Sequence, residues 1–508
     1  MSTNGGRVSE RRIQRRFLKT FGALRKEYAK FHSPALISSI IDYLHEGFDL
    51  NNVEHLRKAP WVQLLLVRWI LTDPDFGRST LVAKPGQVIE IMNKAWKLND
   101  KGRLPSEYPS IQLFMRSIAF QQFPYQERLA LDKIGRQWAL FAQLPEDSLL
   151  QKRFVAICGL SIRDFLSLAF LLAAKLLQNP TIRFNKGFFG PVVNEFGEST
   201  ITAFLGTLSA EFPEVRSALA GQGRDGKHHQ ELLEYSPLSQ WPLLISRGQY
   251  LSWYPTLLFR RLETFIYDVL RASDPAEFMD KFGSIFEDYV GRAIEDSGAS
   301  FLREEDLIPL LEGGKCVDFL IHEREEVVLV DAKAVEIASI ARSTADPRLV
   351  RDRTKGTLLK AIEQAYSVWS KREYLPLQIG EDGTVPYVIV VTFKEHYLGN
   401  GLKYSMAVAD EDIRKIQAKY VGANIPLENI FFLTIDDLDY LSEAVRLGKL
   451  SYADALRHAA ASDEDPKTAK FTFTQSILEL RLGDKPDRVK SCIDELTARL
   501  EGPLIQAQ

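Results

Sequence analysis

The chain has 508 residues, 45% of them hydrophobic and 26% charged, and this length predicts two or three globular domains. Its net charge of −3 excludes a protein that coats nucleic acid with its whole surface, so any polyanion site must be a local basic patch. The 3 cysteines are too few and too scattered for a disulfide framework or a zinc site, and they favour the reducing cytoplasm.

Residues 1–272 are expected to form an all-α region. Their apolar residues recur at spacings of three and four, and no strand pattern stands out. The longest apolar run, residues 165–174, is far shorter than the roughly 20 residues that span a bilayer. We therefore expect a buried core helix there and no membrane segment.

A helix is expected from about Asp274 to Asp296. Asp274 suits the N-cap, Pro275 the first turn and Glu277 the capping-box position. The apolar face of this helix recurs every three or four residues, as in Phe278, Phe282 and Phe286.

Strands and helices then alternate as far as residue 445. The expected elements are strands at 300–311, 316–321 and 327–335, a basic helix at 348–372, a strand at 385–393, and a strand at 430–434 followed by a helix from 436. This order predicts an α/β sandwich domain over residues 273–445. Residues 446–508 are expected to form a helical tail.

Two acids face each other in the expected hairpin. If His322 and Val327 close its turn, the same register sets Asp318 opposite Asp331, and Lys333 lies on the same strand face as Asp331. Like charges placed so closely are destabilising, and Mg²⁺ would compensate because it prefers oxygen ligands. A cation, two carboxylates and an ammonium are suited to phosphodiester hydrolysis.

This pattern resembles the signature of the PD-(D/E)XK nuclease superfamily, whose fold is restriction-endonuclease-like. The residues that carry the resemblance are Glu287, Asp318 and the tripeptide Asp331-Ala332-Lys333. The resemblance implies that Glu287, Asp318, Asp331 and Lys333 are catalytic. It also implies that the three acids and the Ala332 carbonyl hold Mg²⁺, for which Mn²⁺ can substitute, and that Lys333 orients the attacking water.

The resemblance covers roughly residues 276–445. Val317 replaces the proline of the signature, and Gln364 with Tyr366 resembles a pair that some branches carry on the following helix, at a different spacing. We group Gln364 with the residues expected to contact nucleic acid. The others are basic and follow the catalytic strand: Arg348, Arg351, Arg353, Lys355 and Lys360.

Simpler interpretations exist for each of these features. Asp331 and Lys333 could form a structural salt bridge, Glu287 could be a solvated helix acid, and the basic stretch could be a solvated helix face. Against the first, a β-branched strand that buries an acid and a lysine is costly without a function.

The sequence thus predicts a metal-dependent nuclease domain fused to a large helical region. DNA is the expected substrate, RNA (including transfer RNA) is the alternative, and a non-catalytic module that binds nucleic acid or a partner is the third hypothesis. The layout resembles that of microbial anti-phage defence effectors. The helical region would then sense a trigger, bind a partner protein, recognise DNA or mediate a homodimer.

Overall fold

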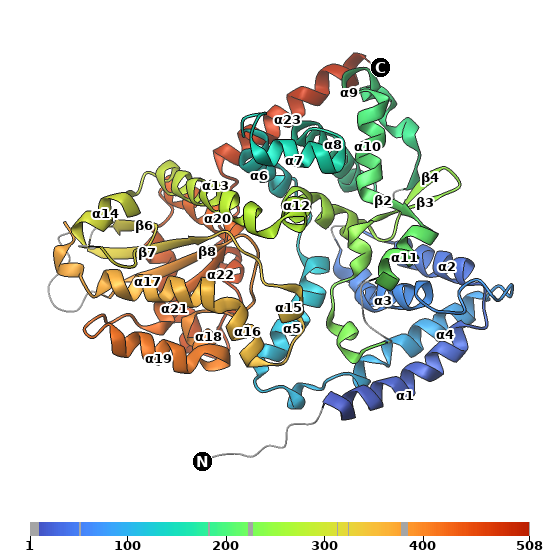
Figure 1. The fold of residues 1–508 in the computed structure, drawn as a ribbon, viewed down its shortest axis with the longest axis horizontal. Coiled ribbons are helices and arrows are strands. Elements are labelled where there is room, and N and C mark those ends of the chain that lie inside the picture. The colour runs from blue at the N-terminus through green and yellow to red at the C-terminus, as the bar shows by residue number, and fades with distance from the viewer. Residues whose placement is uncertain are drawn as a thin grey trace. The chain divides into compact units, whose positions relative to one another are not determined.

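The computed structural model describes residues 10–49, 52–180, 183–221, 227–311, 313–323, 325–376 and 385–506. The chain forms two compact units (Figure 1). The first contains residues 1–270 and 492–508, and the second contains residues 271–491. The boundary after Leu270 lies close to the predicted one after residue 272.

The first unit is mostly helical, as expected. Its helices are α1 (Glu10–Tyr28), α2 (Ser33–His45), α3 (Pro60–Leu71), α4 (Pro85–Trp96), α5 (Ile111–Gln126), α6 (Asp132–Gln137), α7 (Leu149–Cys158), α8 (Ile162–Gln178), α9 (Val193–Phe196), α10 (Glu198–Leu208) and α11 (Phe212–Gly221). Helices α12 (Pro255–Ser273) and α23 (Asp487–Gln506) have residues in both units. The apolar face of α1 is buried against Trp69 of α3, as the contacts of Phe17 and Phe21 with its ring show.

The prediction of an all-α region was wrong, because this unit also holds a small sheet. Its strands are β1 (Arg183–Phe184), β2 (Ser209–Glu211), β3 (Leu243–Ser246) and β4 (Gln249–Ser252), in the order β1-β4-β3-β2. Strands of two to four residues are too short to produce a readable hydrophobic period. The β3–β4 hairpin turns at Arg247 and Gly248. Their positive φ angles of 52° and 74° suit a two-residue turn.

Within the described residues, no single helix is long and apolar enough to cross a membrane. The bent pair α7 and α8 passes that test only when the two helices are taken together. The apolar run of α8 is buried, as predicted, with Phe165, Leu168 and Leu172 all inaccessible.

The second unit is built around a mixed sheet. Its described strands are β5 (Ser300–Arg303), β6 (Phe319–Glu323), β7 (Glu326–Lys333), β8 (Tyr387–Thr392) and β9 (Ile430–Thr434), in that spatial order. β5, β6 and β7 are antiparallel neighbours, and β8 and β9 continue the sheet in parallel with β7. The residues of β8 and β9 are all buried, as expected of strands with both faces covered.

Helices cover both faces of this sheet. The described helices of this unit are α13 (Pro275–Asp296), α14 (Glu304–Leu310), α15 (Ser339–Arg342), α16 (Pro347–Thr354), α17 (Lys360–Trp369), α18 (Gly401–Tyr404), α19 (Asp410–Lys419), α20 (Ile435–Arg446), α21 (Tyr452–Glu464) and α22 (Phe473–Glu479). In Figure 1, α13 and α20 lie on one side of the sheet and α17 on the other. The predicted α/β architecture of this region is therefore present.

Two predictions about this region need correction. The strand expected at residues 300–311 ends at Arg303, because Glu304, Glu305 and Asp306 begin helix α14 and suit the first turn of a helix. The predicted tail is helical but is not a separate unit. Its helices α21 and α22 pack on β7 and β9 within the second unit, whereas residues 492–508 belong to the first.

Candidate functional site

Helix α13 brings Glu287 to the sheet. The Asp274 side chain accepts a hydrogen bond of 3.1 Å from the Glu277 backbone, which caps the helix as predicted. One turn beyond Glu287, Gly291 allows a close approach, since a Cβ there would lie 3.0 Å from the Phe319 ring of β6. Glu287 itself is half-buried.

Asp318, immediately before β6, is held from two sides. The pair His322 and Val327 confirms the predicted hairpin register, which continues to Phe319 opposite Val330. The N–H of Ala332, the residue after Asp331 on β7, donates a hydrogen bond of 2.6 Å to Asp318 Oδ2. On the other side, the Asp318 carbonyl accepts a 2.9 Å hydrogen bond from the backbone N–H of Glu304.

Glu304 therefore lies in the same row as Asp318 and Asp331. The β5–β6 register pairs Arg303 with Phe319, so the next position sets Glu304 opposite Asp318. The β6–β7 register likewise sets Asp318 opposite Asp331. Three acids on adjacent chain segments are thus neighbours across the sheet.

Three carboxylates converge above this row. An oxygen of Glu287, one of Glu304 and one of Asp318 all lie within 4.8 Å of one another. Asp331 lies next to this group in the same row, and its role as a metal ligand stays a prediction. Glu304 was not among the predicted ligands, and it joins Glu287 and Asp318 because β5 ends one residue before the row.

Asp331 and Lys333 form a buried ion pair at the end of β7. Asp331 is 0% exposed, and the Lys333 ammonium contacts its Oδ1. Within the described residues, Asp331 Oδ2 has no hydrogen-bond donor. A buried carboxylate oxygen without a donor is unfavourable, which a purely structural salt bridge does not explain.

The acids destabilise one another's charged forms. Burial raises the pKa of Asp331 to about 7, and the charge of Asp318 adds to that rise while Lys333 opposes it. Burial also raises the pKa of Glu287 and Glu304, again with help from Asp318. The pKa of Asp318 is raised by burial as well, against the effects of Lys333 and the Ala332 N–H.

These residues fit a divalent cation. The three carboxylates repel one another at this spacing, and the buried Asp331 Oδ2 beside them has no donor among the described residues. A hard cation stabilises such an environment. The Ala332 N–H is used by Asp318, and a role of its carbonyl as a ligand stays a prediction.

The basic residues predicted to contact nucleic acid fall into two groups. Arg348, Arg353, Lys355 and Lys360 are exposed on the helical segment from α16 to α17. Lys360 lies near the acids. Its positive charge lowers the pKa of Asp318, against the burial that raises it. Arg351 is instead held by an ion pair with Asp412 of α19, with one hydrogen bond of 2.8 Å.

Gln364 does not lie on the exposed surface expected for a nucleic-acid contact. It is 7% exposed on α17, and its side-chain amide donates to the carbonyl of Cys316. It thereby holds the segment that leads into Asp318. Tyr366 is directed elsewhere, since its hydroxyl donates to the Ile425 carbonyl at 2.7 Å.

Sequence reasoning missed Glu304. A signal was present in the acidic run at residues 304–306, which is typical of a first helical turn. It was overlooked because the strand was expected to continue through it.

The chain matches no protein-family model, no curated protein and no solved structure. The chemistry of the site therefore stands on its own geometry.

Proposed function

We propose that the second unit is a divalent-cation-dependent nuclease that hydrolyses phosphodiester bonds, with DNA as its substrate. One observation carries the proposal: Glu287, Glu304 and Asp318 converge within 4.8 Å beside a buried acid–lysine pair. The resemblance to PD-(D/E)XK nucleases supports the same chemistry, since Glu287, Asp318, Asp331 and Lys333 match the signature.

In this proposal Glu287, Glu304 and Asp318 hold Mg²⁺ or Mn²⁺, and Asp331 contributes negative charge beside them. The chemistry that such a cation supplies when bound is polarisation of a phosphoryl oxygen and a lowered pKa of bound water. The half-buried position of Glu287 and the backbone hydrogen bonds at Asp318 fix the two carboxylates before the substrate arrives.

Lys333 carries the second role. Its ammonium is fixed by the ion pair with Asp331 and its side chain is 13% exposed, so it can meet a solvent or substrate oxygen near the acids. There it would stabilise the negative charge that develops on the phosphate in the transition state. Asp331 acts as the residue that positions this ammonium.

Exposed cations suit the substrate. Lys360 is exposed close to the acids, where its positive charge would pair with a phosphate beside the scissile bond and offset the local negative charge. We place the enzyme in the cytoplasm, in keeping with its three free cysteines, and propose a role in microbial anti-phage defence on its architecture.

The test is incubation of the purified full chain with supercoiled plasmid, linear DNA and total RNA, in Mg²⁺, Mn²⁺ or chelator. We expect cation-dependent cutting of DNA. Lys333→Ala should reduce the rate by about 10²-fold to 10³-fold while binding of DNA in chelator is retained. Cutting of RNA alone would make it a ribonuclease, and the absence of cleavage with any substrate and partner would favour the non-catalytic binding module.

A further inference from the structure

Helix α1 carries a stripe of cations in the first unit. Arg11, Arg12, Arg15, Lys19 and Lys26 are all exposed. At 3.6 residues per turn, they fall within an arc of about 100° on the helix, and they span roughly 22 Å along its axis. We call these five residues the α1 stripe.

The stripe faces away from the core. The buried residues of α1 include Ile13, Phe17 and Phe21, which lie on the opposite side of the helical wheel. The stripe is therefore presented to solvent over most of the length of the helix.

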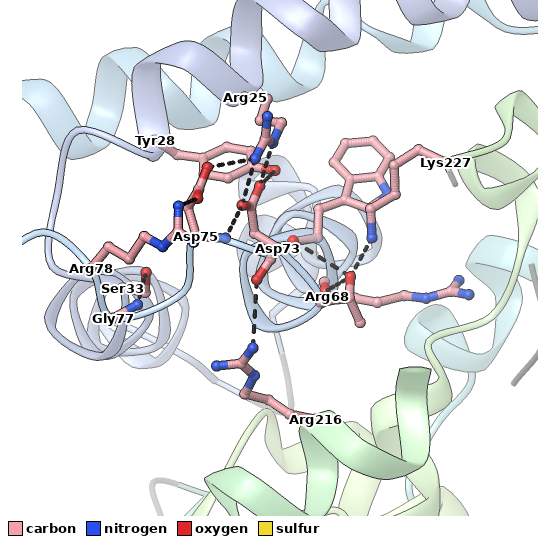
Figure 2. Close-up of polar contacts among 12 residues, drawn as sticks. Arg25, Tyr28, Ser33, Arg68, Asp73, Asp75, Gly77, Arg78, Arg216 and Lys227 are labelled. Carbon is pink, nitrogen blue, oxygen red and sulfur yellow. Dashed lines mark hydrogen bonds and ion pairs between the residues drawn. The ribbon is translucent and has the colours of Figure 1, made fainter. Parts of the chain in front are cut away.

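The stripe cations differ from the other arginines of α1 in their pairing. Within the described residues, none of the five has an ion pair, whereas the two other arginines between them do. Arg16 is paired with Glu107 at 2.9 Å. Figure 2 shows Arg25 held between Asp73 and Asp75, at 2.8 and 2.7 Å. Among the described residues, acids thus pair with the two half-buried arginines of α1 and not with the stripe.

A hollow of about 740 Å³ lies beside the stripe. Arg11, Arg15, Lys19 and His228 are among the residues that line it. Gln14 also lines this hollow. Its side chain donates to the Lys227 carbonyl at 2.7 Å and accepts from the His229 N–H at 3.0 Å. Arg11, Arg15 and Lys19 thus line this open surface together with Glu10, whose carboxylate contacts Arg103 and His229.

We propose that the α1 stripe binds the phosphate backbone of duplex DNA. A row of unpaired cations on a rigid rod matches a regular array of phosphates, whose contacts give affinity without reading sequence. Single-stranded nucleic acid is a poorer fit, because its binding relies on exposed aromatic side chains, and Phe17, Phe21 and Tyr28 are all buried.

An anionic membrane is also a poorer fit. A helix that binds a membrane inserts an apolar face, and the apolar face of α1 is already used in the core. Leu18, at 43% exposed, is the large apolar side chain beside the stripe. The choice of DNA rather than duplex RNA rests on the proposed nuclease function, but the binding itself does not depend on the carboxylate cluster.

The experiment measures the binding of the full chain to a labelled DNA duplex of about two helical turns, by fluorescence anisotropy in chelator over a series of salt concentrations. The variant is Arg11→Ala/Arg15→Ala/Lys19→Ala. We expect its affinity at low salt to fall at least tenfold, and the slope of log K against log salt to shrink by about 2.7, or 0.9 for each lost contact.

The matched control removes three exposed cations elsewhere in the first unit, as Arg57→Ala/Lys152→Ala/Lys175→Ala. It should bind as the wild type does. Arg11→Lys/Arg15→Lys keeps the charge and should keep the affinity, which excludes loss of folding as the cause.

Duplex binding that is unchanged in the triple variant, or equally weakened in the control, would overturn the proposal. So would a variant that loses binding only to vesicles rich in phosphatidylserine, or only to duplex RNA. Loss of binding to both DNA and RNA duplexes would support backbone recognition. Since no cleavage occurs in chelator, the result is independent of whether the second unit is a nuclease.

Discussion

Asp318 and Glu304 occupy the centre of the acidic cluster because the backbone of three chain segments fixes them. The N–H of Ala332 and the N–H of Glu304 both donate to Asp318, one to its side chain and one to its carbonyl. Glu304 follows β5 directly, so its carboxylate is positioned by the strand as well as by helix α14.

Glu304→Gln should lower the affinity for Mn²⁺ by about tenfold or more, because it removes one charge from the three converging carboxylates. Glu305→Gln is the matched control, since Glu305 is the next residue and is exposed. Isothermal titration with Mn²⁺ measures both. An affinity that falls equally in the two variants would mean that only the overall charge matters.

Asp331→Asn should stabilise the protein in chelator at pH 8 and have little effect at pH 4. Burial raises the pKa of Asp331 from 3.8 to about 7, so the folded state holds its proton more tightly than the unfolded state does. The stability that protonated Asp331 contributes to the folded state is therefore fully present below pH 3.8 and is lost as the pH rises to about 7. The difference corresponds to at most about 4 kcal/mol.

The measurement is the free energy of unfolding by urea across this pH range. A constant offset between Asp331→Asn and the wild type at every pH would contradict a raised pKa.

The elements of the second unit differ in how well they could be predicted. The hairpin register was predicted from His322 and Val327, because a short turn between β-branched strands leaves few alternatives. Glu304 could not be placed in the same way. Its partner Asp318 lies across a connection that includes a helix, and no local pattern specifies that register.

The small sheet of the first unit was missed for a related reason. Its strands pair residues as distant as Arg183 and Leu251, and each strand is too short to show its own period. Glu287 was predicted as the acid on the helix that precedes the strands. Its closeness to the sheet depends on Gly291, and the role of that glycine shows only in the structure, where Phe319 packs against it.

Gly291→Ala and Gly283→Ala form a matched pair on α13. A Cβ at Gly291 would lie 2.9 Å from an Arg303 nitrogen and 3.0 Å from the buried Phe319 ring, whereas one at Gly283 meets nothing within 4 Å. We expect Gly283→Ala to stabilise the fold by about 0.5 to 1 kcal/mol. Gly291→Ala should destabilise it by about 1 to 3 kcal/mol and weaken Mn²⁺ binding, because α13 carries Glu287.

Urea unfolding and Mn²⁺ titration of the two variants measure these effects. Equal stability in both variants would show that the helix does not approach the sheet as closely as Gly291 implies.

At the scale of the whole molecule, the chain leaves the first unit at Leu270 and returns to it at Cys492. The returning segment of α23 buries Leu496 completely, and Trp138 donates a 2.7 Å hydrogen bond to Glu495. The part of α23 from Cys492 onward is thus in the first unit, which no local sequence pattern could indicate.

Leu496→Ala should cost about 2 to 5 kcal/mol, because it leaves a cavity in the first unit. Hydrogen exchange should become faster in α7 and α8 and stay unchanged in β7 and β8. Leu478→Ala is the control, because Leu478 is 71% exposed. Faster exchange in β7 and β8 would mean that the two units unfold together.

The initial rate of plasmid cleavage, measured as Mg²⁺ is titrated into the wild type and Asp318→Asn, tests the proposed metal site. If the carboxylate cluster holds the catalytic cation, the rate saturates with Mg²⁺, is absent in chelator, and falls by about 10²-fold or more in Asp318→Asn, which takes a charge from the centre of the cluster. Equal cleavage by Asp318→Asn and the wild type, or cleavage that persists in chelator, would contradict the proposed metal site.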